Sequence, residues 1–150
     1  MSGLYYEEFK PGMEFNHALT RTITEMDNIM FCAMTHNPQP LHLDEEYSKG
    51  TMYGQRIVNS LFTLGLVIGV TVADTTLGTT LGNLGMTDVR FKNPVFHGDT
   101  IHVITRIKEM RESASRPTTG LVVFEHIGIN QRDEEIAYVV RTGLMKKKPV

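Results

Sequence analysis

The chain has 150 residues, which is enough for one domain with its own hydrophobic core, and 41% of them are hydrophobic while 21% are charged. The formal net charge of −2 provides no long-range attraction to nucleic acid or to an anionic membrane, so neither is expected as a partner. The only cysteine, Cys32, excludes an intrachain disulfide and argues against a cysteine-based metal site.

The N-terminal residues and the longest apolar run predict a cytoplasmic protein. Residues 1–8 lack the basic-then-apolar pattern of a signal peptide, and the apolar run 61–73 is shorter than the roughly 20 residues that span a bilayer. No linker, repeat or low-complexity segment divides the chain, so we expect residues 1–150 to form a single domain.

The first third of the chain predicts a strand, a short helix and a polar loop. Residues 15–23 are rich in strand-forming types, and residues 24–27 then form a capping box that begins a helix ending near Met34. Met26, Ile29 and Met30 predict the apolar face of this helix. A proline-stiffened polar loop follows, and residues 44–49 predict one more helical turn that ends at Gly50.

A second, longer helix is predicted over residues 60–74, with Asn59 as its N-cap. Apolar side chains occur on nearly every side of this helix, which predicts that it is enclosed rather than laid on a surface. Gly65 and Gly69 stand four residues apart, and we interpret them as a stripe of small residues that packs closely on a sheet.

The rest of the chain predicts four strands, rich in Val, Ile, Thr, Phe and Tyr and separated by turn sequences, at residues 84–91, 100–109, 120–130 and 135–146. One enclosed helix followed by strands joined by hairpins predicts an α+β fold. In this fold an antiparallel β-sheet wraps around a long central α-helix.

Four motifs, in this order, resemble the MaoC-like dehydratases, the (R)-specific enoyl-CoA hydratase family of the hotdog fold. They are TEMD at residues 24–27, LHLD at 41–44 followed by Tyr47, IVNS at 57–60, and VRFKNPVFHGDT at 89–100. The resemblance covers nearly the whole chain and implies a single MaoC-like hotdog domain with its catalytic loop between the two helices.

The family signature reads aspartate, any residue, asparagine, proline, any residue, histidine, and two registers place it on this loop. The literal pair Asn37-Pro38 could supply the asparagine and the proline. That register puts Thr35 at the acid position and Pro40 at the histidine position.

A second register is anchored on the residues that follow the loop, namely His42, Asp44 and Tyr47, and it needs no gap. We take this register because it keeps the downstream pattern. It places Asn37 at the aspartate position and Gln39 at the asparagine position, and His36 then stands where a glycine is usual.

The resemblance implies reversible addition of water to a trans-2-enoyl-CoA thioester. His42 is the expected acid/base, because an imidazole with a pKa near 6.5 both accepts and donates a proton near neutral pH. The thioester oxygen is expected at the start of the second helix, at Asn59 and Ser60, where the first amide groups have no helical partner. Gln39 and Arg90 are further candidate substrate-binding residues, Arg90 for the phosphates of coenzyme A.

Asn37 leaves the mechanism open, because an uncharged amide orients water but cannot act as a base at neutral pH. In one account His42 makes both proton transfers while Asn37 positions the water. In a second, His36 or Asp44 replaces the missing acid. In a third, hydratase activity is lost and the pocket only binds or hydrolyses thioesters.

Two alternatives therefore accompany the hydratase prediction: a hotdog acyl-CoA thioesterase and a non-catalytic acyl-CoA-binding protein. We expect no metal, since no two histidines stand at the helical i, i+4 spacing, and no cofactor other than coenzyme A within the substrate. One helix on one sheet leaves a sheet edge uncovered, which predicts a homodimer or a larger homo-oligomer. Short, branched, dicarboxylic and long acyl groups are all compatible with the sequence.

Overall fold

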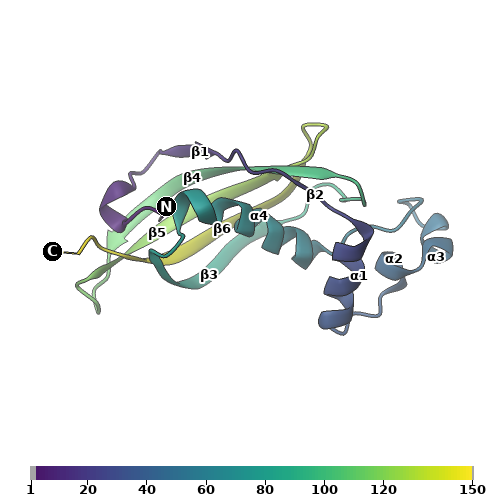
Figure 1. Cartoon of the computed structure of the whole chain (residues 1–150), viewed down its shortest axis with the longest axis horizontal. Helices are drawn as coiled ribbons and strands as arrows, with labels where there is room; N and C mark the ends of the chain where they lie inside the picture. Colours follow the sequence, from purple (N-terminus) through teal and green to yellow (C-terminus); the bar gives the residue numbers. More distant parts are fainter. Residues whose placement is uncertain (1–2, 150) are drawn as a thin grey trace.

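The computed structural model describes residues 3–149 as one antiparallel sheet with the long helix α4 (Ser60–Thr75) against its inner face (Figure 1). The strands lie in the order β1 (Glu14–Asn16), β4 (Thr100–Glu112), β5 (Thr119–Ile129), β6 (Glu135–Lys146) and β3 (Thr80–Arg90), and β2 (Arg21–Thr22) pairs with the start of β4. The α+β prediction is confirmed.

The sheet faces α4 with alternate residues of each strand, as the period of two requires. In β5, Phe124, His126 and Gly128 are buried on the face of the sheet that carries α4, while the residues between them are only half-buried. Gly128 cannot carry a side chain, because an added Cβ would lie 2.5 Å from Val67 of α4. This glycine therefore sets how closely the helix approaches the sheet.

A polar band divides the core into two apolar clusters. On β4, Thr105 lies between Val103 of the first cluster and Ile107 of the second. Four successive hydrogen bonds connect this band, at 2.8 Å for three of them and 3.2 Å for the fourth, and its members are Asp74, His17, Thr105, His126 and Arg141. All but Asp74 are buried, so the band fixes the relative register of the N-terminal segment and three strands.

Three short helices gather at the end of the molecule where α4 begins (Figure 1): α1 (Glu25–Met34), α2 (Pro40–Leu43) and α3 (Glu45–Lys49). The predicted capping box of α1 is present, with Thr24 N–H donating to Asp27 Oδ2 at 2.7 Å and Asp27 N–H donating to Thr24 Oγ1 at 3.3 Å. The turn at residues 44–49 is confirmed as α3, and Gly50 is its C-cap. Helix α2 was not predicted, although a proline at its first position is compatible with a helix start.

The long helix differs from its prediction on one side. Its bounds and its Asn59 cap are confirmed, but it is not enclosed all round, since Leu61 is 63% exposed. Gly65 and Gly69 are also exposed, and a Cβ at either would meet nothing within 4 Å, so the stripe faces away from the sheet and its predicted role is wrong. No helix within residues 3–149 is both long enough and apolar enough to cross a membrane.

Two N-terminal predictions are also corrected. The strand expected at residues 15–23 is split into β1 and β2, because the chain between them leaves the sheet and His17 enters the polar band. The apolar face predicted for α1 points outward, with Met26 and Met30 more than half exposed, and the face that α1 buries carries Asn28 and Cys32.

Candidate active site

The loop between α1 and α2 is held by its own backbone and by one side chain. His36 has φ of 53°, in the left-handed region that favours glycine, at the position where the family pattern has glycine. Asn37 N–H then donates to the carbonyl of Cys32 at 2.9 Å, and Asn37 Oδ1 accepts from Gln39 N–H at 3.0 Å. This turn leads the chain into Pro40 and leaves both Nδ2 hydrogens of Asn37 without a partner among residues 3–149.

His42 is buried, with 9% of its surface exposed, and its Nδ1 lies 2.9 Å from the carbonyl oxygen of Ile57. A carbonyl only accepts, so Nδ1 carries the proton of the neutral imidazole and Nε2 keeps a lone pair. In the described part of the chain Nε2 has no hydrogen-bond partner. His42 therefore presents a basic nitrogen that is free to take a proton.

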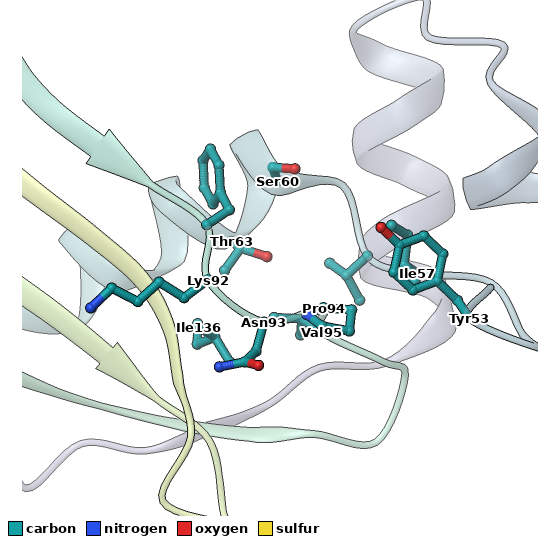
Figure 2. Close-up of a pocket in the computed structure, with 11 residues that line it drawn as sticks. Tyr53, Ile57, Ser60, Thr63, Lys92, Asn93, Pro94, Val95 and Ile136 are labelled. Atoms are coloured by element: carbon teal, nitrogen blue, oxygen red, sulfur yellow. The ribbon is translucent and has the colours of Figure 1, made fainter.

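A hollow of about 160 Å³ opens at the start of α4. Figure 2 shows Ser60 and Thr63 on α4 at one side of this hollow, with Asn93 and Ile136 opposite and Tyr53 at its far end. The mixture of hydroxyl, amide and apolar groups suits a polar ligand group that carries an apolar chain.

Amide groups at the start of α4 are available to such a ligand. Asn59 caps the helix, since its Oδ1 accepts from Leu61 N–H at 2.9 Å. Within residues 3–149 the N–H groups of Ser60 and Phe62 have no acceptor. Unpaired N–H groups at a helix N-terminus stabilise negative charge, as a developing thioester oxyanion requires.

A second hollow, of about 350 Å³, lies beside α1 and is lined mostly by apolar side chains. Its lining includes Ile29, Ala33, Leu43, His36 and Asn37. His42 lines neither hollow, but it directly precedes Leu43, which lines this one, and its Nδ1 bonds to Ile57, which lines the other. The structure thus gathers Asn37, His42 and Ser60 at one end of the molecule.

The sequence did not predict Asn28, which is fully buried beside His42. Its Nδ2 lies 3.2 Å from the carbonyl oxygens of both His42 and Ile57, and its Oδ1 lies 2.9 Å from Asn59 N. The spacing of Asn28 and Cys32, four residues apart on α1, was the available signal. Burial raises the pKa of the Cys32 thiol, so this cysteine is a poor nucleophile.

Besides Asn59, which caps α4, two further predicted binding residues line neither hollow. Arg90 is 57% exposed in its side chain, pairs with Asp88 at 2.6 Å and lies over the Tyr138 ring at 5.6 Å. Gln39 is the N-cap of α2, and its side chain makes no capping hydrogen bond. These two substrate-binding roles remain predictions.

The two groups that could replace a missing acid differ in their surroundings. Asp44 Oδ1 accepts from Tyr47 N–H at 3.0 Å and so caps α3. His36 lines the same hollow as Asn37. The surroundings therefore favour His36 over Asp44 as a second proton carrier near Asn37.

The chain matches known proteins over most of its length. A family model described as the MaoC like domain matches residues 8–128. The chain is 28% identical over 146 residues to a β-methylmalyl-CoA dehydratase of Chloroflexus aurantiacus and 27% identical over 147 residues to a mesaconyl-CoA hydratase of Cereibacter sphaeroides. These stretches are 97% and 98% of this chain but only 41% and 42% of the relatives, so the chain spans about two fifths of their length.

Solved structures share the fold. A protein called a monoamine oxidase regulatory protein, from an Archaeoglobus species, is 29% identical and superposes with a TM-score of 0.87. The match covers 99% of this chain and 98% of that protein. A Mycobacterium tuberculosis protein described as a double hotdog fold matches with a TM-score of 0.85 at 21% identity, over 98% of this chain and 45% of its own. The predicted hotdog fold is confirmed.

Proposed function

Because the chain belongs to the MaoC-like dehydratase family, we propose that it is an enoyl-CoA hydratase that adds water reversibly to a trans-2-enoyl-CoA thioester, giving a 3-hydroxyacyl-CoA. The observation that carries this proposal is the position of His42. Its protonated Nδ1 is fixed on the Ile57 carbonyl, and its Nε2 has no partner within residues 3–149. Helix α4 begins three residues after Ile57, with its first amides unpaired in the same described range.

In the proposed mechanism His42 makes both proton transfers. Nε2 takes a proton from water as the water oxygen bonds to C3, and the π electrons of the double bond move toward the thioester oxygen. The N–H groups of Ser60 and Phe62 stabilise that oxygen while it is negative. The protonated imidazole then gives its proton to C2, which restores the thioester carbonyl and leaves a hydroxyl on C3.

Asn37 positions the water in this mechanism. Its Oδ1 is already bonded to Gln39 N–H, so the side chain offers two N–H donors to the water oxygen. The water can donate one hydrogen to His42 Nε2 at the same time. An amide is sufficient for this role because the base is His42.

We place the thioester in the hollow at Ser60 and the acyl chain in the apolar hollow beside α1. The protein is proposed to act as a homodimer, since among residues 3–149 strand β3 pairs only with β6, and its outer edge carries exposed apolar side chains. Residues 1–150 are proposed as one functional hotdog domain, and a cytoplasmic location remains a prediction.

The test is purified protein against a panel of straight, branched and dicarboxylic enoyl-CoA thioesters, with enoyl absorbance and free thiol followed together. Hydration removes the absorbance without releasing thiol, and this is the expected result for at least one thioester. Release of thiol would replace the proposal with a thioesterase. No change on either channel, with acyl-CoA raising the melting temperature, would replace it with a non-catalytic binding protein.

A further inference from the structure

We propose that Asn28 is a positioning residue of the active site, whose carboxamide fixes the His42 imidazole relative to the amide groups that begin α4. The expected effect of Asn28 on catalysis rests on the proposed hydratase function. Its effect on the tautomer and orientation of the His42 ring can be measured without any turnover.

The partners of Asn28 determine which way its carboxamide lies. On the Nδ2 side are the carbonyl oxygens of His42 and Ile57, which only accept, and on the Oδ1 side is the backbone N–H of Asn59, which only donates. A flipped carboxamide would oppose oxygen with oxygen and N–H with N–H. The orientation is therefore fixed by chemistry.

The side-chain amide of Asn28 has no spare hydrogen-bond donor. Its Nδ2 also lies 3.0 Å from Nε2 of His97, so this nitrogen and the two carbonyl oxygens share two hydrogens. Burial and the charge of Arg56 hold the pKa of His97 below its usual range, which keeps Nε2 an acceptor. Because Asn28 is fully buried, removal of the carboxamide would leave buried polar groups without partners.

The carbonyl oxygen of Ile57 accepts hydrogen bonds from both side chains, from His42 Nδ1 at 2.9 Å and from Asn28 Nδ2 at 3.2 Å. Asn28 Nδ2 also donates to the backbone carbonyl of His42. Its Oδ1 holds Asn59, the N-cap of α4. The Asn28 side chain of α1 thus links His42, the proposed base on α2, with the proposed oxyanion site on α4. Displacements of about 1 Å between such groups can lower a rate about 100-fold.

The first test is nitrogen-15 NMR of the His42 ring, assigned by the signal that disappears in His42→Gln. The unaltered protein is expected to show one neutral tautomer, protonated at Nδ1. In Asn28→Ser, which has the shorter side chain, a mixture of tautomers is expected. A ring protonated at Nε2 in the unaltered protein would overturn the proposal. This measurement needs no variant at position 28, so it tests the proposal even if Asn28→Ser fails to fold.

The second test is kinetic and uses Asn28→Asp, which keeps the shape and the Oδ1 acceptor but loses both donors. We expect kcat to fall about 100-fold with KM nearly unchanged. The added negative charge should also move the pH dependence of kcat toward higher pH. Equal profiles for the variant and the unaltered protein would refute a positioning role.

Asn130→Ser is the matched control, because Asn130 is an equally buried asparagine whose partners, Arg132 and Glu134, belong to the turn between β5 and β6. It should lower the melting temperature and leave the His42 tautomer and pH profile unchanged. If it changes them as Asn28→Ser does, the effect is general destabilisation and the proposal fails. Absence of hydration by the unaltered protein would instead refute the proposed function, with the NMR result still deciding on Asn28.

Discussion

His42 and Asn37 each bond the backbone through one side-chain atom and keep another atom without a partner among residues 3–149. For His42 the bonded atom is Nδ1 and the free one is Nε2, and for Asn37 they are Oδ1 and Nδ2. The backbone contacts orient each side chain, and the free atoms are available to water or substrate. Substitution at either position should therefore change chemistry more than stability.

His42→Ala should abolish hydration while the protein stays folded. Loss of a general acid/base lowers kcat by roughly 10²–10⁴-fold, and here one ring makes both transfers. The Ile57 carbonyl keeps its hydrogen bond from Asn28, which limits the loss of stability. Steady-state kinetics and circular dichroism measure the two effects, with His102→Ala, a strand histidine on β4, as the control. Retained turnover would exclude His42 as the base.

Asn37→Asp should be tolerated and should hydrate at least as fast as the unaltered protein. The carboxylate restores the family's acid at that position and can still accept from Gln39 N–H. Initial rates between pH 5 and 9 measure the effect, with Asn37→Ala expected to be slower because it cannot hold the water. Complete loss of activity in Asn37→Asp would show that the two N–H donors of the amide are required.

The role of a side chain could be predicted from the sequence where its partners are close in the chain. It could not be predicted where the partners are distant in the chain. The Thr24–Asp27 capping box lies within four residues, so the sequence alone reveals it. Asn28 depends on partners 14, 29, 31 and 69 residues away. Its role follows only from the tertiary structure, because its four-residue spacing from Cys32 indicates a shared helix face but none of its partners.

The elements themselves were predictable where periodicity and caps agree. The four long strands and the long helix begin and end close to their predicted positions. Helix α1 was placed correctly but its buried face was not, since the hydrophobic pattern marks a face that this chain leaves exposed. Burial of Asn28 and Cys32 instead follows from the polar partners that surround them.

Thr24→Ala should destabilise the protein by about 1 kcal/mol, the usual effect of removing an N-cap side chain. Thr24 Oγ1 accepts from Asp27 N–H, and the variant leaves that donor unpaired at the start of α1. Urea unfolding measures the difference. Thr20→Ala, at an exposed threonine outside any helix or strand, should have little effect, and an equal loss there would contradict a capping role.

The polar band has one consistent set of hydrogen-bond directions, because its ends are a guanidinium that only donates and a carboxylate that accepts. Arg141 donates to His126 Nε2, His126 Nδ1 to Thr105, Thr105 to His17 Nε2, and His17 Nδ1 to Asp74. Both imidazoles are therefore neutral. A second proton on His126 would set N–H against N–H within the core.

Stability should accordingly fall as the pH decreases from 7 to 5. Burial and then the charge of Arg141 hold the pKa of His126 well below its usual value. The unfolded chain then binds more protons than the folded one, so this contribution is fully present above about pH 6.5 and is lost as the pH falls toward the folded pKa. Urea midpoints at pH 7.5 and 5.5 measure it. His126→Asn should be less stable but flatter with pH, and an unchanged slope would exclude His126 as the source.

The whole molecule has apolar surface at several places that the single chain does not cover. The exposed stripe of α4 contains Leu61 and Gly65. Strand β3, the next element along the chain, has Leu84, Met86 and Val89 exposed, and in the described part of the chain its outer edge is unpaired. A second copy that pairs its β3 with this edge would extend the sheet and bring the two long helices together. Such an arrangement would cover the part of α4 that the single chain leaves exposed.

Met86→Lys should convert the proposed dimer into a monomer. Met86 pairs with Arg141 across β6 and β3, and its side chain remains 41% exposed. A lysine there would place two like charges across a two-fold interface and remove apolar contact area. Molar mass from light scattering after gel filtration measures the change. Met52→Lys is the matched control, because Met52 is 90% exposed and lies far from β3 in the sequence, and it should remain dimeric. A monomeric unaltered protein with full hydratase activity would show instead that one chain forms the complete site.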